Sequence, residues 1–297
     1  MNDSGGSDNA WVKAMPVIFV LIWSTGFIVA RFGMPNSPPM KFLALRYALS
    51  ILCFLPWIVL AKVTWPTERV QWRHLAVTGV LMHACYLGGV WAAIKAGMGS
   101  GLAALIVGLQ PVLTAFWLSG NGARVSQRQW LGLGLGFAGL VMVVSRKFGS
   151  GGEADWLNMA LAVAALFGIT IGTLYQKRFV APCDVRTASV IQLGAALLVT
   201  LPLTLFEPEA MRWDGALMGA MAWSVLALTL GGSSLLYLLI QRGAAASVTS
   251  LMYLVPPCTA LLAWLLFAEP ITASTIAGTL LTAVGVNLVV RPAKQPV

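Results

Sequence analysis

The residues that could do chemistry in this chain are a few polar and aromatic side chains set in the middle of long apolar runs. His83 is the mid-run group whose ordinary pKa lies near neutrality. Tyr86 follows it by three residues, which predicts a shared helix face. A lone histidine in an apolar helix is also common as a packing residue, so both interpretations stay open. The other groups expected at similar depth are Trp23, Ser24, Gln110, Thr170, Ser233, Ser234 and Tyr253.

These side chains are mostly neutral, and their chemistry limits what a cavity among them could bind. Aromatic faces with a few hydrogen-bonding groups suit an amphipathic solute with an apolar or aromatic body and a polar or zwitterionic head. A multiply charged phosphate would need several buried Lys or Arg side chains, and Arg46 alone lies inside a run. Arg46 is about a turn and a half from the run's start, so it can snorkel to the surface. Binding of a substrate carboxylate is the alternative role.

Prolines within the runs could supply backbone chemistry. Pro111, Pro256 and Pro257 are expected in mid-helix, where each ring removes a hydrogen bond to the carbonyl four residues earlier. A carbonyl freed at the middle of the membrane can bind a substrate ammonium, and the kink can serve as a hinge. Fixed kinks in a packed bundle are the alternative.

Acidic residues are absent from the expected membrane interior. All ten Asp and Glu residues fall in loops, tails or at the edges of expected spans. Proton-coupled pumps usually keep a carboxylate at bilayer depth, so we expect no carboxylate-driven proton exchange. The four cysteines have no paired metal-ligand spacing. We therefore expect neither a metal site nor a cofactor.

The runs that must position these groups indicate a membrane protein. Hydrophobic residues make up 58% of the chain and charged residues only 10%, against roughly 25% charged in a soluble domain. Runs long enough to cross a bilayer as helices are expected at residues 14–32, 40–61, 72–96, 99–119, 126–145, 156–178, 184–206, 215–241, 245–267 and 271–290. The net charge of +9 is scattered through short loops, so nucleic acid is not an expected partner.

The chain reads as two copies of one unit. A shift of 146 residues, without any gap, places Pro257 on Pro111 and Gly285 on Gly139. The Gly/Ser-rich linker 148–155 separates a first five-helix repeat (residues 1–147) from a second (residues 156–297).

An odd number of spans per copy inverts the second copy in the membrane. The predicted fold is thus an all-α integral membrane protein of about ten transmembrane helices in two inverted five-helix repeats. Such repeats are typical of secondary transporters, although duplication can also merely enlarge a bundle.

The charges in the loops predict the orientation of the chain in the membrane, and the glycines predict where helices pack closely. The side that holds the N-terminus carries 12 Lys and Arg residues and the other side 6, so both termini are expected in the cytoplasm. Small-residue faces predict close helix packing, within the chain or in a dimer. They comprise Gly132, Gly136, Gly139, Gly278 and Gly285. We expect a monomer, with a dimer as the alternative.

Short motifs in both halves resemble a known family. IWSTGF in the first span, GLQP in the fourth, FAEPIT after the ninth and the G-x-x-L-x-x-x-G of Gly278 to Gly285 resemble the ten-helix EamA-type members of the drug/metabolite transporter superfamily. More narrowly, the chain is similar to bacterial inner-membrane exporters of aromatic amino acids. Glu269 departs from the repeat because its partner is Ala123, which argues for a structural role in the second copy only.

The resemblance implies an inner-membrane transporter that exports amino acids, aromatic ones especially, and related small metabolites. Alternating access would need no membrane carboxylate. The first, third, fourth, sixth, eighth and ninth spans would line the cavity, and the fifth and tenth would buttress it. A broad exporter of lipophilic cations or drugs and a nucleotide-sugar-type carrier are the alternatives. An enzyme or scaffold is not expected, because the chain lacks H-E-x-x-H, a Ser/His/Asp set at one depth and any loop long enough to fold alone.

Overall fold

The computed structural model describes residues 5–120, 126–147, 154–235 and 254–290, and these residues form helices and connections without a β-strand. The first half contains α1 (Gly5–Gly33), α2 (Pro39–Leu60), α3 (Arg69–Gly79), the π-helix η1 (Val80–Cys85), α4 (Tyr86–Lys95), α5 (Ser100–Val107), α6 (Gln110–Gly120) and α7 (Gln127–Lys147). The second half contains α8 (Trp156–Phe179), α9 (Val185–Leu203), the 3-10 helix η2 (Thr204–Phe206), α10 (Gly215–Trp223), the π-helix η3 (Ser224–Ser233), α13 (Val255–Phe267) and α14 (Ala273–Val290).

The helices fall where the apolar runs predict them. Within the described residues, 7 helical segments are long and apolar enough to cross a membrane, and three shorter apolar helices lie at Val17–Gly33, Val255–Phe267 and Ala273–Leu288. The third expected span, 72–96, is the continuous segment Arg69–Lys95. An all-helical membrane fold of about ten spans is therefore confirmed.

Acidic residues in the connections fix where several of these helices begin. Asp155 accepts a hydrogen bond from the Asn158 amide while the Asn158 side chain bonds back to the Asp155 amide, which forms a capping box at the start of α8. The Asp184 side chain accepts from the Arg186 amide at the start of α9, and the Asp214 side chain accepts from the Leu217 amide at the start of α10. Each cap satisfies amides that the first helical turn leaves unpaired, so these boundaries follow directly from the sequence.

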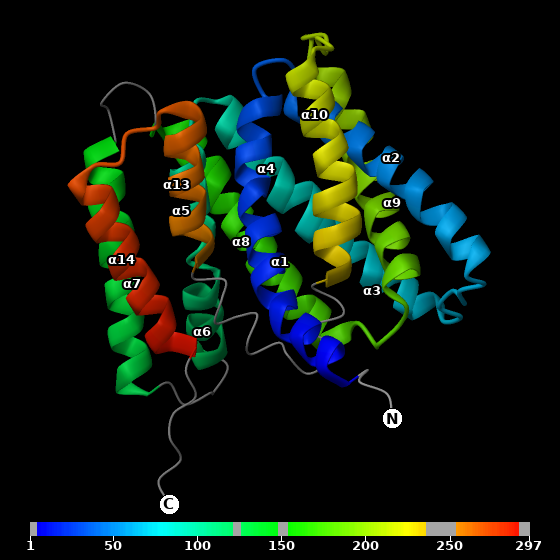
Figure 1. Ribbon diagram of the computed structural model, residues 1–297, viewed down its shortest axis with the longest axis horizontal. Coiled ribbons are helices and arrows are strands. Elements are labelled where there is room, and N and C mark those ends of the chain that lie inside the picture. The colour runs from blue at the N-terminus through cyan, green and yellow to red at the C-terminus, as the bar shows by residue number, and fades with distance from the viewer. Residues whose placement is uncertain (1–4, 121–125, 148–153, 236–253, 291–297) are drawn as a thin grey trace, which may run out of the picture.

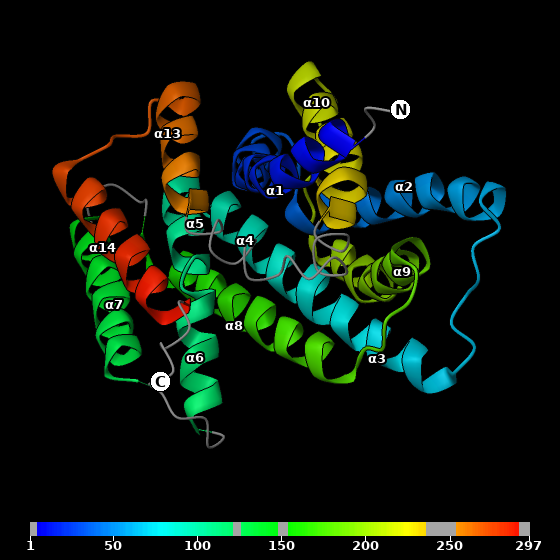
Figure 2. The same ribbon diagram turned by 60° about the horizontal axis from the view of Figure 1, so that its bottom comes forward.

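The two halves are packed around an approximate two-fold axis. α1 begins and α14 ends on the same face, the bottom of Figure 1, whereas α8 begins on the opposite face, so the second half runs inverted. α7 and α14 pack along each other at one edge, and α2 and α9 pair toward the other edge (Figure 2). α3 packs on α8, and its repeat counterpart α10 packs on α1.

A glycine-rich contact between α7 and α14 lies on this axis. The Thr282 hydroxyl donates to the Gly136 carbonyl at 3.4 Å, and the two residues are 146 positions apart, so a residue is bonded to its own repeat counterpart. Gly139 faces the backbone of Gly278, and Gly285 faces the backbone of Gly132, which is the same contact made twice. The predicted small-residue faces therefore meet each other within one chain.

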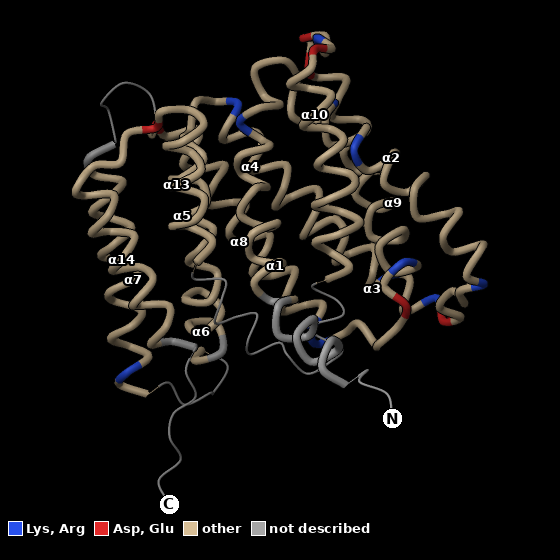
Figure 3. The backbone as a smooth tube through the Cα atoms, in the orientation of Figure 1, with Lys and Arg blue, Asp and Glu red and all other residues tan. Residues whose placement is uncertain are grey.

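Most charged residues gather at the two ends of the helices (Figure 3). On the upper face, the top of Figure 1, the Glu207 carboxylate accepts hydrogen bonds from the amides of Met40 and Lys41 at the start of α2, both at 2.9 Å. Lys95 pairs with Glu209 at 2.6 Å. This hydrogen bond holds the pKa of the Glu209 carboxyl below its ordinary value. Connections from both halves are thus tied together on the upper face.

Candidate functional site

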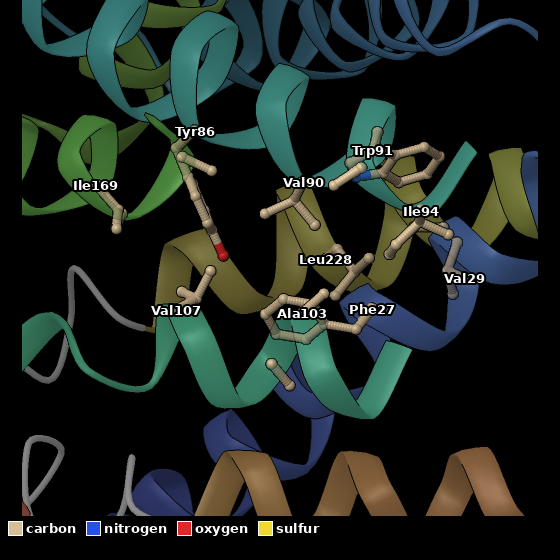
Figure 4. Close-up of a cluster of buried hydrophobic side chains, with 14 of the residues drawn as sticks. Phe27, Val29, Tyr86, Val90, Trp91, Ile94, Ala103, Val107, Ile169 and Leu228 are labelled. Carbon is tan, nitrogen blue, oxygen red and sulfur yellow. The ribbon is translucent and has the colours of Figure 1, made fainter. Parts of the chain in front are cut away.

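A cavity lies between the two halves at the centre of the bundle. It is lined by residues of α1, α4, α5, α6, α8 and α13, together with the α5–α6 connection: Trp23, Phe27, Tyr86, Ala104, Val107, Gly108, Gln110, Pro111, Ile169 and Val255. Tyr86 projects from α4 toward Val107 of α5, and Ile169 of α8 lies on the cavity's other side (Figure 4). The cavity volume of about 40 Å³ has room for a few water molecules only. The bundle therefore leaves little free space at this position.

Four of the predicted site residues meet at this cavity. Trp23, Tyr86, Gln110 and Pro111 come from three different spans, and all four line it. The Gln110 side-chain amide donates to the Thr173 hydroxyl at 2.9 Å and so links α6 to α8. The lining is an aromatic and aliphatic surface with very few hydrogen-bonding groups. Such a surface can hold the body of an amphipathic solute.

A break in the fourth span shapes the cavity wall. α5 ends at Val107 and α6 begins at Gln110, because Pro111 has no amide to donate to the Val107 carbonyl. A Cβ atom at Gly108 would lie 2.8 Å from Pro256 Cγ, so this glycine lets the broken span approach the ninth span closely. The kink predicted at Pro111 is present.

The other two prolines are placed differently from the prediction. Pro256 and Pro257 lie in the first turn of α13, where a missing amide breaks no helical hydrogen bond. The mid-helix position expected for them is therefore wrong for the helix as described. The carbonyls that they were expected to free belong to Met252 and Tyr253, which lie outside the described residues.

The predicted hydroxyl groups bond to their own helices instead of lining the cavity. Ser24 donates to the Val20 carbonyl at 2.7 Å, and Thr170, its counterpart 146 residues later, donates to the Leu166 carbonyl at 2.6 Å. Both side chains are buried. Ser233 donates to the Leu228 carbonyl at 3.5 Å. In the described part of the chain the buried Ser234 hydroxyl has no hydrogen-bond partner. Tyr253 lies outside the described residues.

The third span contains a π-helix that separates His83 from Tyr86. η1 widens the helix over Val80–Cys85, so the spacing of three residues no longer places the two side chains one above the other. The His83 ring lies edge-on to the Tyr47 ring at 6.0 Å, and its backbone carbonyl accepts the Tyr47 hydroxyl at 2.8 Å. Tyr86 instead lines the cavity. Of the two side chains expected on one face, only that of Tyr86 lines the cavity.

Arg46 is buried inside the bundle. Only 6% of its surface is exposed, and its Nε and Nη2 atoms donate to the Thr229 hydroxyl of η3 at 3.2 and 3.1 Å. The expectation that this side chain snorkels to the surface is wrong, because it spans from α2 into the second half. A charged side chain at the centre of a membrane helix costs about 2.5–3.5 kcal/mol, so such residues usually have a function.

The same arrangement recurs across the two-fold axis with different residues. The position 146 residues after Arg46 is Gln192, and the position 146 residues before Thr229 is His83. The Gln192 side chain lies beside the His83 ring, close enough to affect its protonation. Arg46 of the second span thus contacts Thr229 of the eighth span, and Gln192 of the seventh span lies beside His83 of the third span. The first contact involves a cation and the second a neutral amide.

Gln192 and Thr229 were missed by the sequence reasoning, and Arg46 was placed at the surface. The signal that could have found them is the repeat itself. The shift of 146 residues aligns one mid-span polar residue with another at both positions. A search restricted to polar groups near the centre of each span overlooks such pairs.

The described residues hold no cluster of three or more His, Cys, Asp or Glu side chains that could bind a metal ion. Several carboxylates among them cap helix ends. Glu269, for example, is buried on the upper face and accepts hydrogen bonds from the Ser100 amide at 3.0 Å, the Ser100 hydroxyl at 2.8 Å and the Gly101 amide at 3.4 Å. It caps α5.

Comparison with known proteins gives matches along most of the chain. The EamA-like transporter family matches residues 11–145 and again residues 156–291. The chain is 25% identical to an uncharacterized transporter, YvbV, of Bacillus subtilis, over 91% of this chain and 88% of that one. A probable amino-acid metabolite efflux pump of Salmonella typhimurium is 22% identical, over 92% and 93%. A protein of known crystal structure has a TM-score of 0.68 and 18% identity, covering 94% and 96%, which supports the fold alone.

Proposed function

Because the chain belongs to the EamA-like transporter family, we propose that it exports amino acids, aromatic ones in particular, and related small metabolites across a bacterial inner membrane. Both termini would lie in the cytoplasm. The domain division proposed is residues 1–147 and 156–297 on either side of the linker 148–155. The working unit would be a monomer, and no enzymatic activity or cofactor forms part of the proposal.

One observation carries this proposal: a small, largely aromatic and aliphatic cavity is lined by residues of both halves. Trp23, Phe27 and Tyr86 offer ring surfaces to an apolar or aromatic body, and Gln110 offers a hydrogen-bonding amide. The cavity must widen to admit an amino acid, since about 40 Å³ holds only water. Rocking of one half against the other would open it to each side in turn.

The proposed transport is driven by the substrate gradient. All Asp and Glu residues fall in loops, tails or at the edges of expected spans, so no carboxylate is available at mid-membrane to exchange a proton. α7 and α14, which pack on each other at the edge of the bundle, would support the moving helices. His83, Ser233, Ser234 and Tyr253 remain proposed site residues that the cavity as described does not include.

Reconstitution into liposomes tests the substrate class. Vesicles containing the purified protein should exchange labelled L-phenylalanine or L-tryptophan faster than empty vesicles, and abolishing a proton gradient should leave the rate unchanged. Flux equal to that of empty vesicles for every amino acid would reject the substrate class. Flux that collapses with the proton gradient would reject the uncoupled mechanism.

Cavity variants test the site. Trp23→Ala and Gln110→Ala should each raise the transport KM about tenfold, since each removes a contact of about 1–1.5 kcal/mol. Trp130→Ala is the matched control, because Trp130 is half exposed on α7 and does not line the cavity. Equal kinetics for all three variants would remove the cavity from consideration as the binding site.

A further inference from the structure

We propose that Arg46 binds the carboxylate of the transported solute, an inference that rests on the proposed function and specifies its site. The side chain is buried, with 6% of its surface exposed. No Asp or Glu occurs between Gly215 and Ala268, or between Ala14 and Thr67, so α2 and η3 bring no counter-charge to it. A buried cation without a carboxylate partner is stabilised when an anion binds.

The hydrogen bonds of Arg46 leave donors for such an anion. A guanidinium carries five N–H donors. Within the described residues, Nε and Nη2 both donate to one neutral oxygen, the Thr229 hydroxyl. That hydroxyl in turn donates to the Ser224 carbonyl at 2.9 Å, so Thr229 orients the guanidinium without neutralising it. The remaining donors fit a carboxylate, which arginine binds with two parallel hydrogen bonds.

Tyr86 connects this cation to the cavity. It lines the cavity together with Trp23 and Phe27, and its helix α4 packs on α2, which carries Arg46. A solute whose ring lies against Trp23 and Phe27 can therefore extend its charged head past Tyr86 toward Arg46 once the cavity widens. The geometry predicts an orientation: the aromatic body toward α1 and the carboxylate toward α2.

The residues at the two positions related by the two-fold axis differ, so the proposed carboxylate site occurs in one half only. Gln192 occupies the position equivalent to Arg46 and lies beside His83, the counterpart of Thr229. One half thus presents a positive charge and the other a neutral amide. A carboxylate has one preferred partner here, and a lipophilic cation would meet an uncompensated positive charge. The site accordingly favours amino acids and other carboxylates over organic cations.

Three probes that share a phenyl ring test the proposal in liposomes: L-phenylalanine, 3-phenylpropionate, which lacks the amine, and 2-phenylethylamine, which lacks the carboxylate. Arg46→Gln is the informative variant, because the fold already accommodates glutamine at the equivalent position 192. It should raise KM for both carboxylates about 10- to 100-fold, the range expected for a charge-assisted hydrogen bond, and leave 2-phenylethylamine unaffected or improved.

Two further variants separate binding from folding. Thr229→Val removes the neutral partner but keeps the charge, so the preference for carboxylates should persist. Arg46→Lys keeps the charge without the planar fork and should retain that preference with weaker binding, even if the glutamine variant does not assemble. Loss of the preference in the lysine variant, with a protein that runs as wild type in gel filtration, would contradict the proposal.

The outcomes distinguish this site from the proposed function. If wild-type protein transports L-phenylalanine and Arg46→Gln changes all three probes equally or none, the carboxylate site is refuted and the transporter proposal stands. If it transports 3-phenylpropionate in an Arg46-dependent manner but no amino acid, the substrate proposal fails and the site stands. Transport of 2-phenylethylamine alone would refute both.

Discussion

Replacing Gly285 with alanine should separate α7 from α14 and destabilise the protein. A Cβ atom added at Gly285 would lie 2.5 Å from both the Gly132 carbonyl oxygen and the Gly136 amide nitrogen. These are backbone atoms in the facing helix, so no side-chain rotation can make room. Restoring an ordinary contact of about 3.4 Å requires the helices to move apart by about 1 Å.

The size of the effect follows from two opposing terms. Overpacking of a tight contact costs about 1–3 kcal/mol, and the move would also lengthen the Thr282–Gly136 hydrogen bond, already 3.4 Å. Alanine gains about 1 kcal/mol over glycine in helix propensity. Gly134→Ala on α7 isolates that gain, because a Cβ atom there meets nothing within 4 Å. We expect Gly134→Ala to be neutral or stabilising and Gly285→Ala to be about 1–3 kcal/mol less stable than this control.

Unfolding of the purified protein in mixed micelles, followed by tryptophan fluorescence as denaturing detergent is added, measures the difference. Gly139→Ala provides an internal check, because Gly139 is the repeat counterpart of Gly285 and its added Cβ atom would lie 2.6 Å from Thr282 Oγ1. The two substitutions should destabilise by similar amounts. A stability for Gly285→Ala equal to that of Gly134→Ala would refute the close packing on the axis.

Three further predictions concern the upper face and the helix starts. Glu269→Ala leaves the Ser100 amide and hydroxyl without their acceptor and should lower the free energy of unfolding by about 1–3 kcal/mol in the same assay; an unchanged midpoint would contradict the capping role. Lys95→Met should raise the pKa of Glu209, now below its ordinary value of 4.5. A carboxyl whose pKa is lower in the folded protein stabilises the fold above its unfolded pKa, and this stabilisation is lost as the pH falls through its folded pKa. The Lys95–Glu209 pair should therefore break only below about pH 4.5, which a carboxyl-carbon NMR titration can follow. An unchanged Glu209 pKa in the Lys95→Met variant would refute the pairing. Asp155→Ala removes the capping box of α8 and should cost about 0.5–2 kcal/mol, whereas Asp155→Asn should cost less, and equal losses would argue against the cap.

The sequence predicts the helices of this fold well because bilayer thickness and chain duplication are both strong constraints. An apolar run of about 20 residues matches the thickness of the bilayer, and a helix satisfies all its backbone hydrogen bonds within the run. The repeat then requires that each contact of one half recur in the other. Loop aspartates such as Asp155 and Asp214 mark where helices start, and the structure places caps there. Even the packing of the glycine faces against each other follows from residue size.

The site was predicted less completely, for reasons that lie in helix geometry. A period of 3.6 residues puts His83 beside Tyr86, but η1 changes that period where the polar groups sit. Nothing in the local sequence VLMHAC distinguishes a π-helix from an α-helix. Arg46 lies near enough to the start of its helix to reach water, so the sequence alone favours a surface position for its side chain. The hydrogen bond to Thr229 of the other half, which holds the side chain in the interior, is visible only in the structure.

The bond between Thr282 and Gly136 has a mechanical consequence. Because each residue is the counterpart of the other, exchanging the conformations of the two halves maps this pair of positions onto itself, although the threonine hydroxyl bond itself has no symmetric equivalent. Any rearrangement that obeys the two-fold would therefore leave this pair in place while contacts away from the axis are swapped. The Thr282–Gly136 pair can therefore stay in contact while the two halves move relative to each other. Sequence differences between the halves, such as arginine at 46 and glutamine at 192, would then determine which of the two conformations is more stable.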